Sequence, residues 1–342
     1  MEDAIKAITN NDFLSAILTT IALIILGFIL RKANLFNEHS KKTLTTILMK
    51  IALPCLAFTG FIIDFDTTIL VQSGWIILFT VIAYLACLLI GHLIFHKCHT
   101  TRKSIYAILM TFGQITLFGL PLVKAIYGNT GVLVGNIMSI PFRIFLYIYC
   151  FIIISETKLE RGAIKDTLKN VFCNPIIIAM LVSMILWIAQ PILPKVAIDE
   201  VNYSIFRIDK TMPWLYKSLS TIANLTMPLS MLLIGVTLGD IDIKSAFTSK
   251  TAWIISIFRS IISPIIIGII VYLFLLIPNV NLSTEMVSAI IICFAAPVSA
   301  VVNTFCVTYN KEAITSSDTC FLSTLLLIVF VPFIIILVEL IF

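Results

Sequence analysis

Apolar residues along this chain gather in long runs that are separated by short polar segments. A membrane-spanning helix needs about 20 consecutive apolar residues, and on that measure the pattern predicts ten spans. We place them at residues 13–30, 44–63, 71–95, 104–127, 131–155, 172–193, 218–238, 251–277, 286–309 and 315–341. The pattern therefore predicts an all-α polytopic membrane protein whose surroundings are the lipid bilayer.

Composition supports this class and excludes others. Hydrophobic residues make up 60% of the chain and charged residues 12%, and the mean hydropathy is +1.09, which excludes an ordinary water-soluble domain. The net charge of +5 comes from basic residues scattered through short loops, so we expect no nucleic-acid partner. The eight cysteines have no CxxC or other metal-ligand spacing, and we expect neither a metal nor a cofactor.

The basic residues are divided unevenly between the two sides of the membrane. Alternate loops, beginning with the first, hold fourteen Lys and Arg residues, whereas the loops and terminus on the other side hold five. By the positive-inside rule, both termini face outward. We expect the protein to lie in the plasma membrane.

Four prolines inside the apolar runs form two pairs with nearly the same offset in residue number. Pro54 pairs with Pro228, and Pro121 pairs with Pro297. The Asp-x-Asp motif at 64–66 returns at 240–242, with the same offset as the second proline pair. The chain thus reads as two copies of one unit, and because each copy has five spans, the second must lie inverted in the membrane. We assign residues 1–155 to the first repeat, 156–170 to a charged cytoplasmic linker and 171–342 to the second repeat.

Spans 4 and 9 concentrate the candidate chemistry. Gly113, Gly119 and Pro121 weaken the helix in span 4, and small residues surround Pro297 in span 9, where Ser299 and Asn303 follow. If both helices are broken and cross there, each presents a half-helix N-terminus with free N–H donors and about half a positive charge. Such a site at mid-membrane suits a carboxylate.

Each of these residues also has a simpler interpretation. Glycine and proline in membrane helices commonly mark kinks or packing notches. The amides of Gln114 and Asn303 could bridge neighbouring helices. Pro54 and Pro228 are interpreted as structural bends.

The charges inside the spans are cationic. Lys50, Lys124, Arg143 and Arg259 lie within spans, and no Asp or Glu lies near the middle of any span. Charged residues at that depth are costly and are functional by default. Lys124 is a candidate site or gating residue, whereas Arg143 and Arg259 could equally fix packing or a helix end. An anionic substrate fits this surplus better than a cation does.

Span 4 carries a close resemblance to a known family. The run from Gly119 to Gly128, GLPLVKAIYG, resembles the motif Gly-x-Pro-Leu-x-Lys-Ala-x-Tyr-Gly of the auxin efflux carrier family, which includes plant PIN-FORMED carriers and bacterial malate and malonate permeases. Gln114 stands where that family has Asn. Further similarity lies at 174–175, 303–305 and 323–325. Pro297 lies farther from Asn303 than the family proline commonly does.

The resemblance implies a ten-span carrier in which broken spans 4 and 9 cross. It further implies that spans 1, 2, 6 and 7 form a scaffold that mediates homodimerisation, and that spans 3–5 and 8–10 form a mobile transport domain. On this basis we expect a secondary transporter that moves a small organic anion by elevator-type alternating access. The expected substrate-binding residues are Gln114, Gly119, Pro121, Lys124, Pro297, Ser299 and Asn303.

Two other functions stay open. A sodium-coupled organic anion symporter of bile-acid-transporter type would need oxygen-rich cation ligands beside the crossing. A non-transporting sensor with the same fold would bind the ligand in the same pocket. An enzyme is not expected, since the sequence contains no HExxH motif, no GxGD motif and no Ser–His pair at matching depth.

Overall fold

The computed structural model describes residues 11–155, 174–198, 201–241, 243–278 and 280–341, and these residues are mostly helical. The first part contains α2 (Asn11–Lys32), α3 (Glu38–Ile47), η1 (Leu48–Ala52), α4 (Leu53–Thr59), α5 (Thr67–Ile94), α6 (Thr100–Thr111), η2 (Ile115–Gly119), α7 (Leu120–Ile144), η3 (Phe145–Cys150) and α8 (Phe151–Ser155). The second part contains α10 (Pro175–Ala189), β1 (Lys195–Ile198), β2 (Val201–Ser204), α11 (Ile208–Thr211), α12 (Pro213–Asn224), α13 (Thr226–Gly239), α14 (Ile243–Thr248), α15 (Lys250–Ile257), η4 (Phe258–Ile262), α16 (Ser263–Leu275), α17 (Thr284–Ala295), α18 (Ala300–Thr308) and α19 (Ala313–Ile341). The η elements are single π-helical turns.

Six helical stretches in the described part of the chain are long and apolar enough to cross a membrane. They are Glu38–Thr59, Thr67–Ile94, Ile115–Ile144, Pro213–Gly239, Lys250–Leu275 and Ala313–Phe330. The chain is therefore an integral multi-pass membrane protein. Each of the ten predicted ranges overlaps a helix in the described part of the chain, but the arrangement as ten crossings in two inverted repeats stays a prediction. The predicted linker, 156–170, lies outside the described residues.

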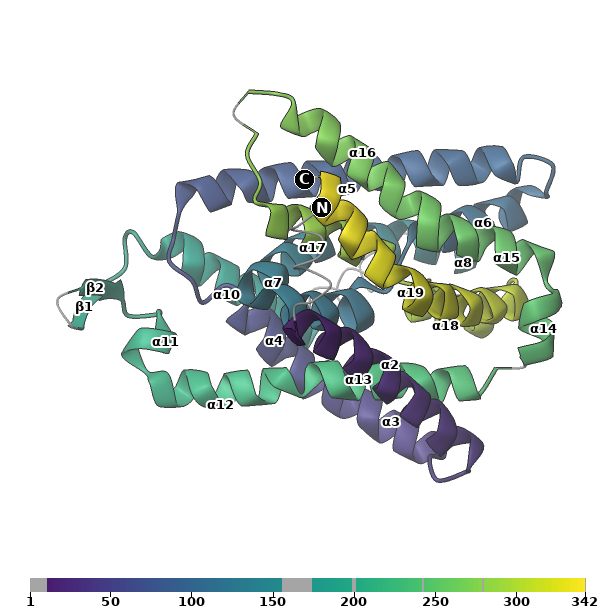
Figure 1. Cartoon of the computed structure of the whole chain (residues 1–342), viewed down its shortest axis with the longest axis horizontal. Coiled ribbons are helices and arrows are strands. Elements are labelled where there is room, and N and C mark those ends of the chain that lie inside the picture. The colour runs from purple at the N-terminus through teal and green to yellow at the C-terminus, as the bar shows by residue number, and fades with distance from the viewer. Residues whose placement is uncertain (1–10, 156–173, 199–200, 242, 279, 342) are drawn as a thin grey trace.

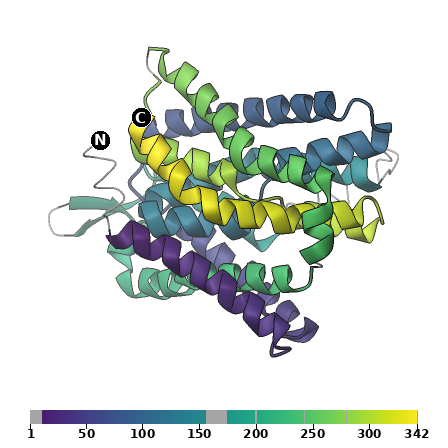
Figure 2. The ribbon, with the colours of Figure 1, turned by 45° about the vertical axis from the view of Figure 1, so that its right-hand side comes forward.

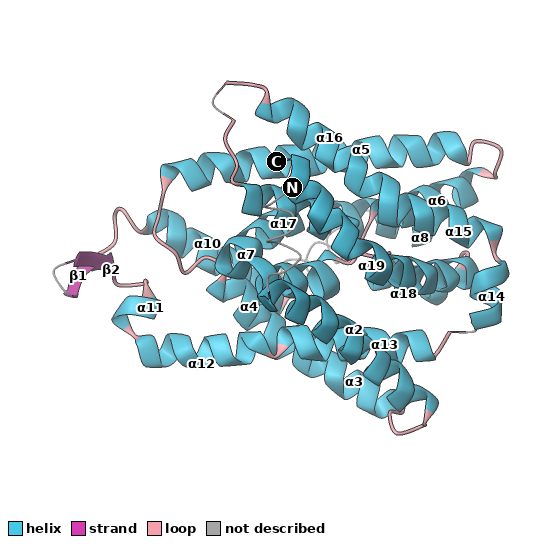
Figure 3. Ribbon diagram, in the orientation of Figure 1, coloured by secondary structure: helices cyan, strands magenta, loops and turns pink. Residues whose placement is uncertain are grey.

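One short β-hairpin interrupts the helical architecture (Figure 3). Strands β1 and β2 pair antiparallel, with Lys195 opposite Ser204 and Ile198 opposite Val201. The apolar pattern predicts a loop between spans for this segment. Two such short strands give too little alternation to be recognised beside such strong apolar runs.

The helices pack in two groups that meet at the centre of the molecule. Along the lower edge of Figure 1, α2 and α3 lie beside α12 and α13, while α5 and α16 follow the upper edge. Within the first group, α2 packs along α13 and α10 packs along α4; within the second, α17 packs on α7, α16 and α19. In the rotated view of Figure 2, the purple α2 again lies beside the green end of α13.

Two glycines permit the close approach of α2 and α13. A Cβ atom added to Gly27 would lie 2.2 Å from the carbonyl oxygen of Leu232, and one added to Gly235 would lie 2.0 Å from that of Ile24. Small residues at such contacts let helix backbones come together in membranes, where van der Waals packing replaces the hydrophobic driving force. The two glycines therefore fix the spacing of this helix pair.

Three of the π-helical turns stand directly before prolines. The turns η1, η2 and η4 are followed, after one intervening residue, by Pro54, Pro121 and Pro264. Each proline lies inside continuous helix, because the residue before the following α-helix keeps right-handed helical φ and ψ. Within a continuous helix the proline ring would clash with the carbonyl one turn earlier. That carbonyl belongs to the π turn in all three cases, and the wider turn leaves room for the ring.

Candidate functional site

Two helix interruptions face each other at the centre of the molecule. Helix α6 ends at Thr111 before η2 begins at Ile115, and α17 ends at Ala295 before α18 begins at Ala300. The two interrupted segments pair antiparallel through a single bridge between Gly113 and Val298. The backbone N–H of Gln114 donates to the carbonyl of Pro297 at 2.7 Å, and that of Ser299 donates to the carbonyl of Phe112 at 3.0 Å. Each break thus satisfies backbone groups of the other, as a non-helical segment at membrane depth requires.

The break in span 4 lies before Pro121 rather than at it. The expected half-helix N-terminus at Pro121 is instead formed at Ile115, with Gln114 as its N-cap residue. The wide turn η2 carries the helix past the position of the proline ring, so Pro121 lies inside continuous helix. In span 9 the interruption does contain Pro297.

Gln114 caps the helix of the opposite segment. Its Oε1 accepts a hydrogen bond of 2.6 Å from the backbone N–H of Ala300, the first residue of α18. Ser299, the N-cap residue of α18, makes no side-chain cap of its own. The cap fixes the orientation of the Gln114 amide, because only its oxygen can accept this bond. Its NH2 group has no partner among the described residues.

The side-chain amide of Asn303 is oriented like that of Gln114, with its oxygen hydrogen-bonded to other protein groups. Its Oδ1 accepts hydrogen bonds from the hydroxyls of Ser316, at 2.6 Å, and Ser317, at 3.1 Å. Both hydroxyls belong to α19. The Asn303 NH2 group likewise has no partner within the described part of the chain, so both amides have satisfied oxygens and NH2 groups free to donate.

A cavity of about 280 Å³ connects these groups. Its lining comes from both helix groups: α3 and the end of α13 on one side, the two breaks with α18 and α19 on the other. The lining residues are Lys41, Thr45, Gln114, Leu117, Leu233, Ile234, Thr237, Leu238, Ile241, Pro297, Val298, Ala300, Asn303, Thr304, Cys320 and Thr324. Among the residues that the structure describes, no Asp or Glu lines this cavity.

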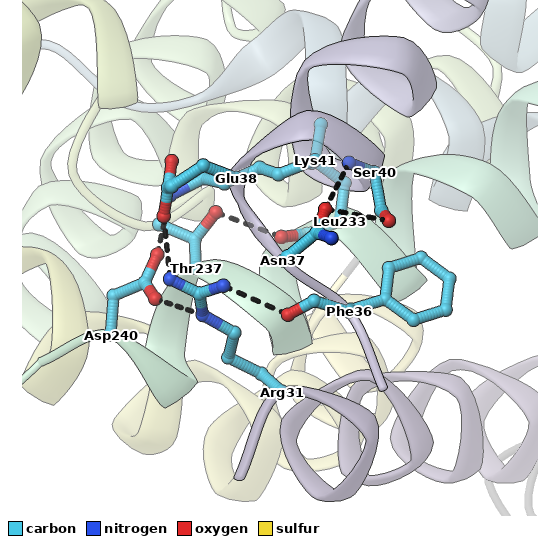
Figure 4. A network of polar contacts seen from close by, with 9 residues as sticks. All are labelled: Arg31, Phe36, Asn37, Glu38, Ser40, Lys41, Leu233, Thr237 and Asp240. Carbon is cyan, nitrogen blue, oxygen red and sulfur yellow. Dashed lines mark hydrogen bonds and ion pairs between the residues drawn. The ribbon is translucent and has the colours of Figure 1, made fainter. Parts of the chain in front are cut away.

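Lys41 brings a positive charge to the cavity wall. Its Nζ pairs with Asp240 Oδ2 at 2.5 Å, and Asp240 also pairs with Arg31, which bonds to Glu38 and the Phe36 carbonyl (Figure 4). The network joins the end of α2, the start of α3 and the end of α13. Lys41 is thereby held beside the cavity by a carboxylate that does not itself line it.

The other predicted site residues lie outside the cavity lining. Ser299 is buried behind it, and Gly119 packs against α17, where an added Cβ would lie 3.3 Å from the Cα of Cys293. Pro121 is buried in the first turn of α7. Lys124 donates to Asn129 Oδ1 at 2.8 Å on the same helix. Of the predicted set, the structure thus places Gln114, Pro297 and Asn303 in the cavity lining and the other four outside that lining.

Lys41 lines the cavity but is not among the site residues predicted from the sequence. The hydropathy pattern places it in a loop, because the apolar run of span 2 begins only at residue 44. The helix itself begins at Glu38, and Asn37 caps it by accepting from the N–H of Ser40 at 2.9 Å. An Asn followed by an acidic residue is a helix-start signal, and that signal predicts the earlier start.

The family follows from comparison with known proteins. Residues 12–335 match the family described as membrane transport protein, which is the auxin efflux carrier family. The chain belongs to the auxin efflux carrier family. This family consists of transporters and not of enzymes. A comparison with curated proteins gives no match. Membership in the auxin efflux carrier family agrees with the motif in span 4, whose Gly119–Gly128 run forms the end of η2 and the start of α7.

Two further residues of the family resemblance have local structural roles. Asn174 caps α10 by accepting from the N–H of Ile176 at 2.9 Å, with Pro175 in the first turn. Ser323 Oγ accepts from the N–H of Val298 at 3.1 Å. The second contact ties α19 to the break in span 9.

Proposed function

We propose that this protein is a secondary transporter that moves a small organic anion, a mono- or dicarboxylate, across the plasma membrane by elevator-type alternating access. The observation that carries the proposal is the cavity between the two breaks on one side and α3 and α13 on the other. Its two amides have their oxygens engaged by protein donors, and the Lys41 ammonium, which is paired with Asp240, adds further N–H donors. A carboxylate is an acceptor with up to about four lone-pair sites, so it complements NH2 and ammonium donors.

The helix that starts at Ala300 supports the same substrate class. Its N-terminus lines the cavity, and the partial positive charge of a helix N-terminus favours an anion. A sodium ion would need oxygen ligands, and the Gln114 and Asn303 oxygens already accept protein hydrogen bonds. These contacts favour the anion over a cation at this position.

Two matched ion pairs support an inverted repeat. Arg31 pairs with Asp240, and Arg207 pairs with Asp64. The offset in residue number from Arg31 to Arg207 equals that from Asp64 to Asp240, so a repeat with this constant offset would make each ion pair the copy of the other. If a two-fold axis relates two repeats, a contact between two residues must recur between the two equivalent residues of the other repeat. The pairs obey this rule, as do the packing of α2 on α13 and of α10 on α4.

The proposed mechanism uses the two helix groups as scaffold and transport domain. The scaffold would comprise spans 1, 2, 6 and 7 and form a homodimer, and spans 3–5 and 8–10 would carry the substrate. The cavity lies where these groups meet, with Lys41, Thr45 and Thr237 from the scaffold and Gln114 and Asn303 from the transport domain. Movement of one group along the other would carry the bound anion with the breaks.

Transport activity is tested in proteoliposomes that contain the full chain. Uptake of a panel of mono- and dicarboxylates is measured with and without gradients of pH, sodium and voltage. We expect saturable uptake of at least one carboxylate, and the gradient that accelerates it identifies the coupling. Absence of saturable uptake for every acid under every gradient would refute the function.

The inverted topology is tested by labelling single cysteines with a membrane-impermeant maleimide. Lys195→Cys, in β1, is expected to react on intact cells, because both termini and this hairpin face outward in the proposal. His39→Cys, at the start of α3, is expected to react only after permeabilisation. The parent protein reports labelling of native cysteines, and the reverse pattern would contradict the topology.

A further inference from the structure

The deepest charged side chain in the described structure lies behind the two helix breaks. Arg259, in the π turn η4, is 0% exposed. Among the described residues, no Asp or Glu forms a salt bridge with it. A buried cation without a carboxylate is costly unless other groups satisfy it, so its hydrogen bonds show what balances the charge.

The guanidinium binds the carbonyl ends of both interrupted helices. Nη1 donates to the carbonyl of Thr111, the last residue of α6, at 2.7 Å. Nε donates to the carbonyl of Ala296, the C-cap of α17, at 2.9 Å, and Nη2 donates to that of Phe294. Nη1 also donates to Ser263 Oγ at 3.0 Å. The Phe294 ring lies 5.2 Å from the Arg259 Cζ.

Gly113 leaves the space that this contact needs. A Cβ atom added there would lie 1.9 Å from Arg259 Nη2 and 2.6 Å from the carbonyl oxygen of Ala296. Both distances are shorter than any non-bonded contact allows. The glycine that weakens the helix in span 4 therefore also admits the guanidinium between the two breaks.

The four helix ends at the crossing have opposite partial charges. The C-termini of α6 and α17 each carry about half a negative charge, and the N-termini at Ile115 and Ala300 each carry about half a positive one. Arg259 neutralises the negative pair. The N-terminal pair stays on the cavity side, where Gln114 and Ala300 line the wall. With its full positive charge added, the crossing favours an anion.

We infer that Arg259 is a positioning residue that fixes the two breaks against each other and makes their crossing selective for anions. The charge-selectivity part rests on the proposed function, and the positioning part does not. Two readouts therefore separate them: carboxylate transport kinetics, and backbone hydrogen exchange of the ligand-free protein at residues 112–114, 296 and 298–300.

Three variants of the full chain test the inference. Arg259→Gln keeps NH2 donors but removes the charge, and we expect the KM for the carboxylate to rise about tenfold, with faster exchange at both breaks. Arg259→Lys keeps the charge but loses the planar fork, so the KM should stay within about threefold of wild type while turnover falls and exchange rises. Ser263→Ala, the matched control, keeps the charge and the bonds to all three carbonyls and should behave as wild type.

Each outcome of these measurements supports or overturns the inference about Arg259. Unchanged KM in a folded Arg259→Gln protein would overturn charge selection, and unchanged exchange in both Arg259 variants would overturn positioning. If Arg259→Gln does not fold, Arg259→Lys decides: altered turnover and exchange support the inference, wild-type values or failure to fold overturn it. If wild-type protein transports no carboxylate, the proposed function fails, and hydrogen exchange still tests positioning.

Discussion

The side-chain oxygen of Gln114 accepts a hydrogen bond from the backbone N–H of Ala300, on the opposite break, at 2.6 Å. This bond caps α18 and leaves the amide NH2 of this cavity-lining residue without a partner among the described residues. The residue thus joins the architecture of the crossing to its proposed chemistry, and the two roles can be separated by substitution.

Gln114→Glu keeps the capping oxygen and replaces the NH2 donor with a negatively charged oxygen. We expect carboxylate uptake to fall below about a tenth of wild type, since the lost donor and added repulsion each weaken anion binding. Thermal stability should change little, because a carboxylate also caps a helix N-terminus well. Uptake is measured in proteoliposomes at matched protein content. Wild-type uptake in this variant would contradict the role of the NH2 group.

Gln114→Asn tests the cap instead. The shorter side chain is about 1.5 Å short of the present reach, so the bond to Ala300 should be lost while an amide donor remains. We expect lower thermal stability and a moderate rise in KM, measured by thermal unfolding and by uptake. A variant with unchanged stability would show that the cap contributes little.

Asn303→Asp retains the oxygen that accepts from Ser316 and Ser317. It replaces the NH2 donor by a second anionic oxygen, so we expect saturable carboxylate uptake to be lost while the protein stays folded. Asn303→Ala removes both functions and should lose uptake together with some stability. Folding is checked by size-exclusion chromatography, and an active Asn303→Asp protein would refute the assignment of Asn303.

Lys41 and Lys42 offer a matched comparison on α3. Lys41 lines the cavity and Lys42 does not. We expect Lys41→Gln to raise the KM about fivefold at low ionic strength and less at high ionic strength, because salt screens exposed charges. Lys42→Gln should leave the KM unchanged. Equal effects of the two variants on the KM would show that Lys41 acts through the overall surface charge and not through its place in the cavity.

The contact between α2 and α13 predicts a stability difference between two glycines. Gly235→Ala places a Cβ 2.0 Å from the Ile24 carbonyl, and overpacking of this kind costs about 1–3 kcal/mol. Gly74→Ala, in α5, meets nothing within 4 Å and should be neutral or stabilising through helix propensity. Thermal unfolding of both variants measures the difference, and equal melting temperatures would contradict the packing argument.

Particular residues show how far sequence reasoning reaches. The apolar runs predict the positions of the helices, because length and hydropathy dominate in a bilayer. Glycine and proline point to both interruptions, although the π turn before Pro121 moves the first one to residues 112–114. A proline in a membrane helix is accommodated either by a kink or by a wide π turn, and the local sequence does not distinguish the two, so that shift could not be predicted.

The polar contacts of the site depend on the fold. Gln114 and Asn303 are predicted as site residues, yet the partners that orient their amides, Ala300, Ser316 and Ser317, are set by packing between separate segments. Sequence reasoning leaves Arg259 open as a packing or helix-end residue, and it does bind two helix ends. Only the structure shows that both helix ends belong to the crossing.

The central claim is that the cavity beside the two breaks selects a carboxylate for transport. It is tested most directly by uptake of three compounds that share one carbon skeleton and end in a carboxylate, a methyl ester or an amine. We expect saturable uptake of the carboxylate alone, with Asn303→Asp abolishing it. Saturable uptake of the amine but not of the acid, retained in Asn303→Asp, would contradict the account.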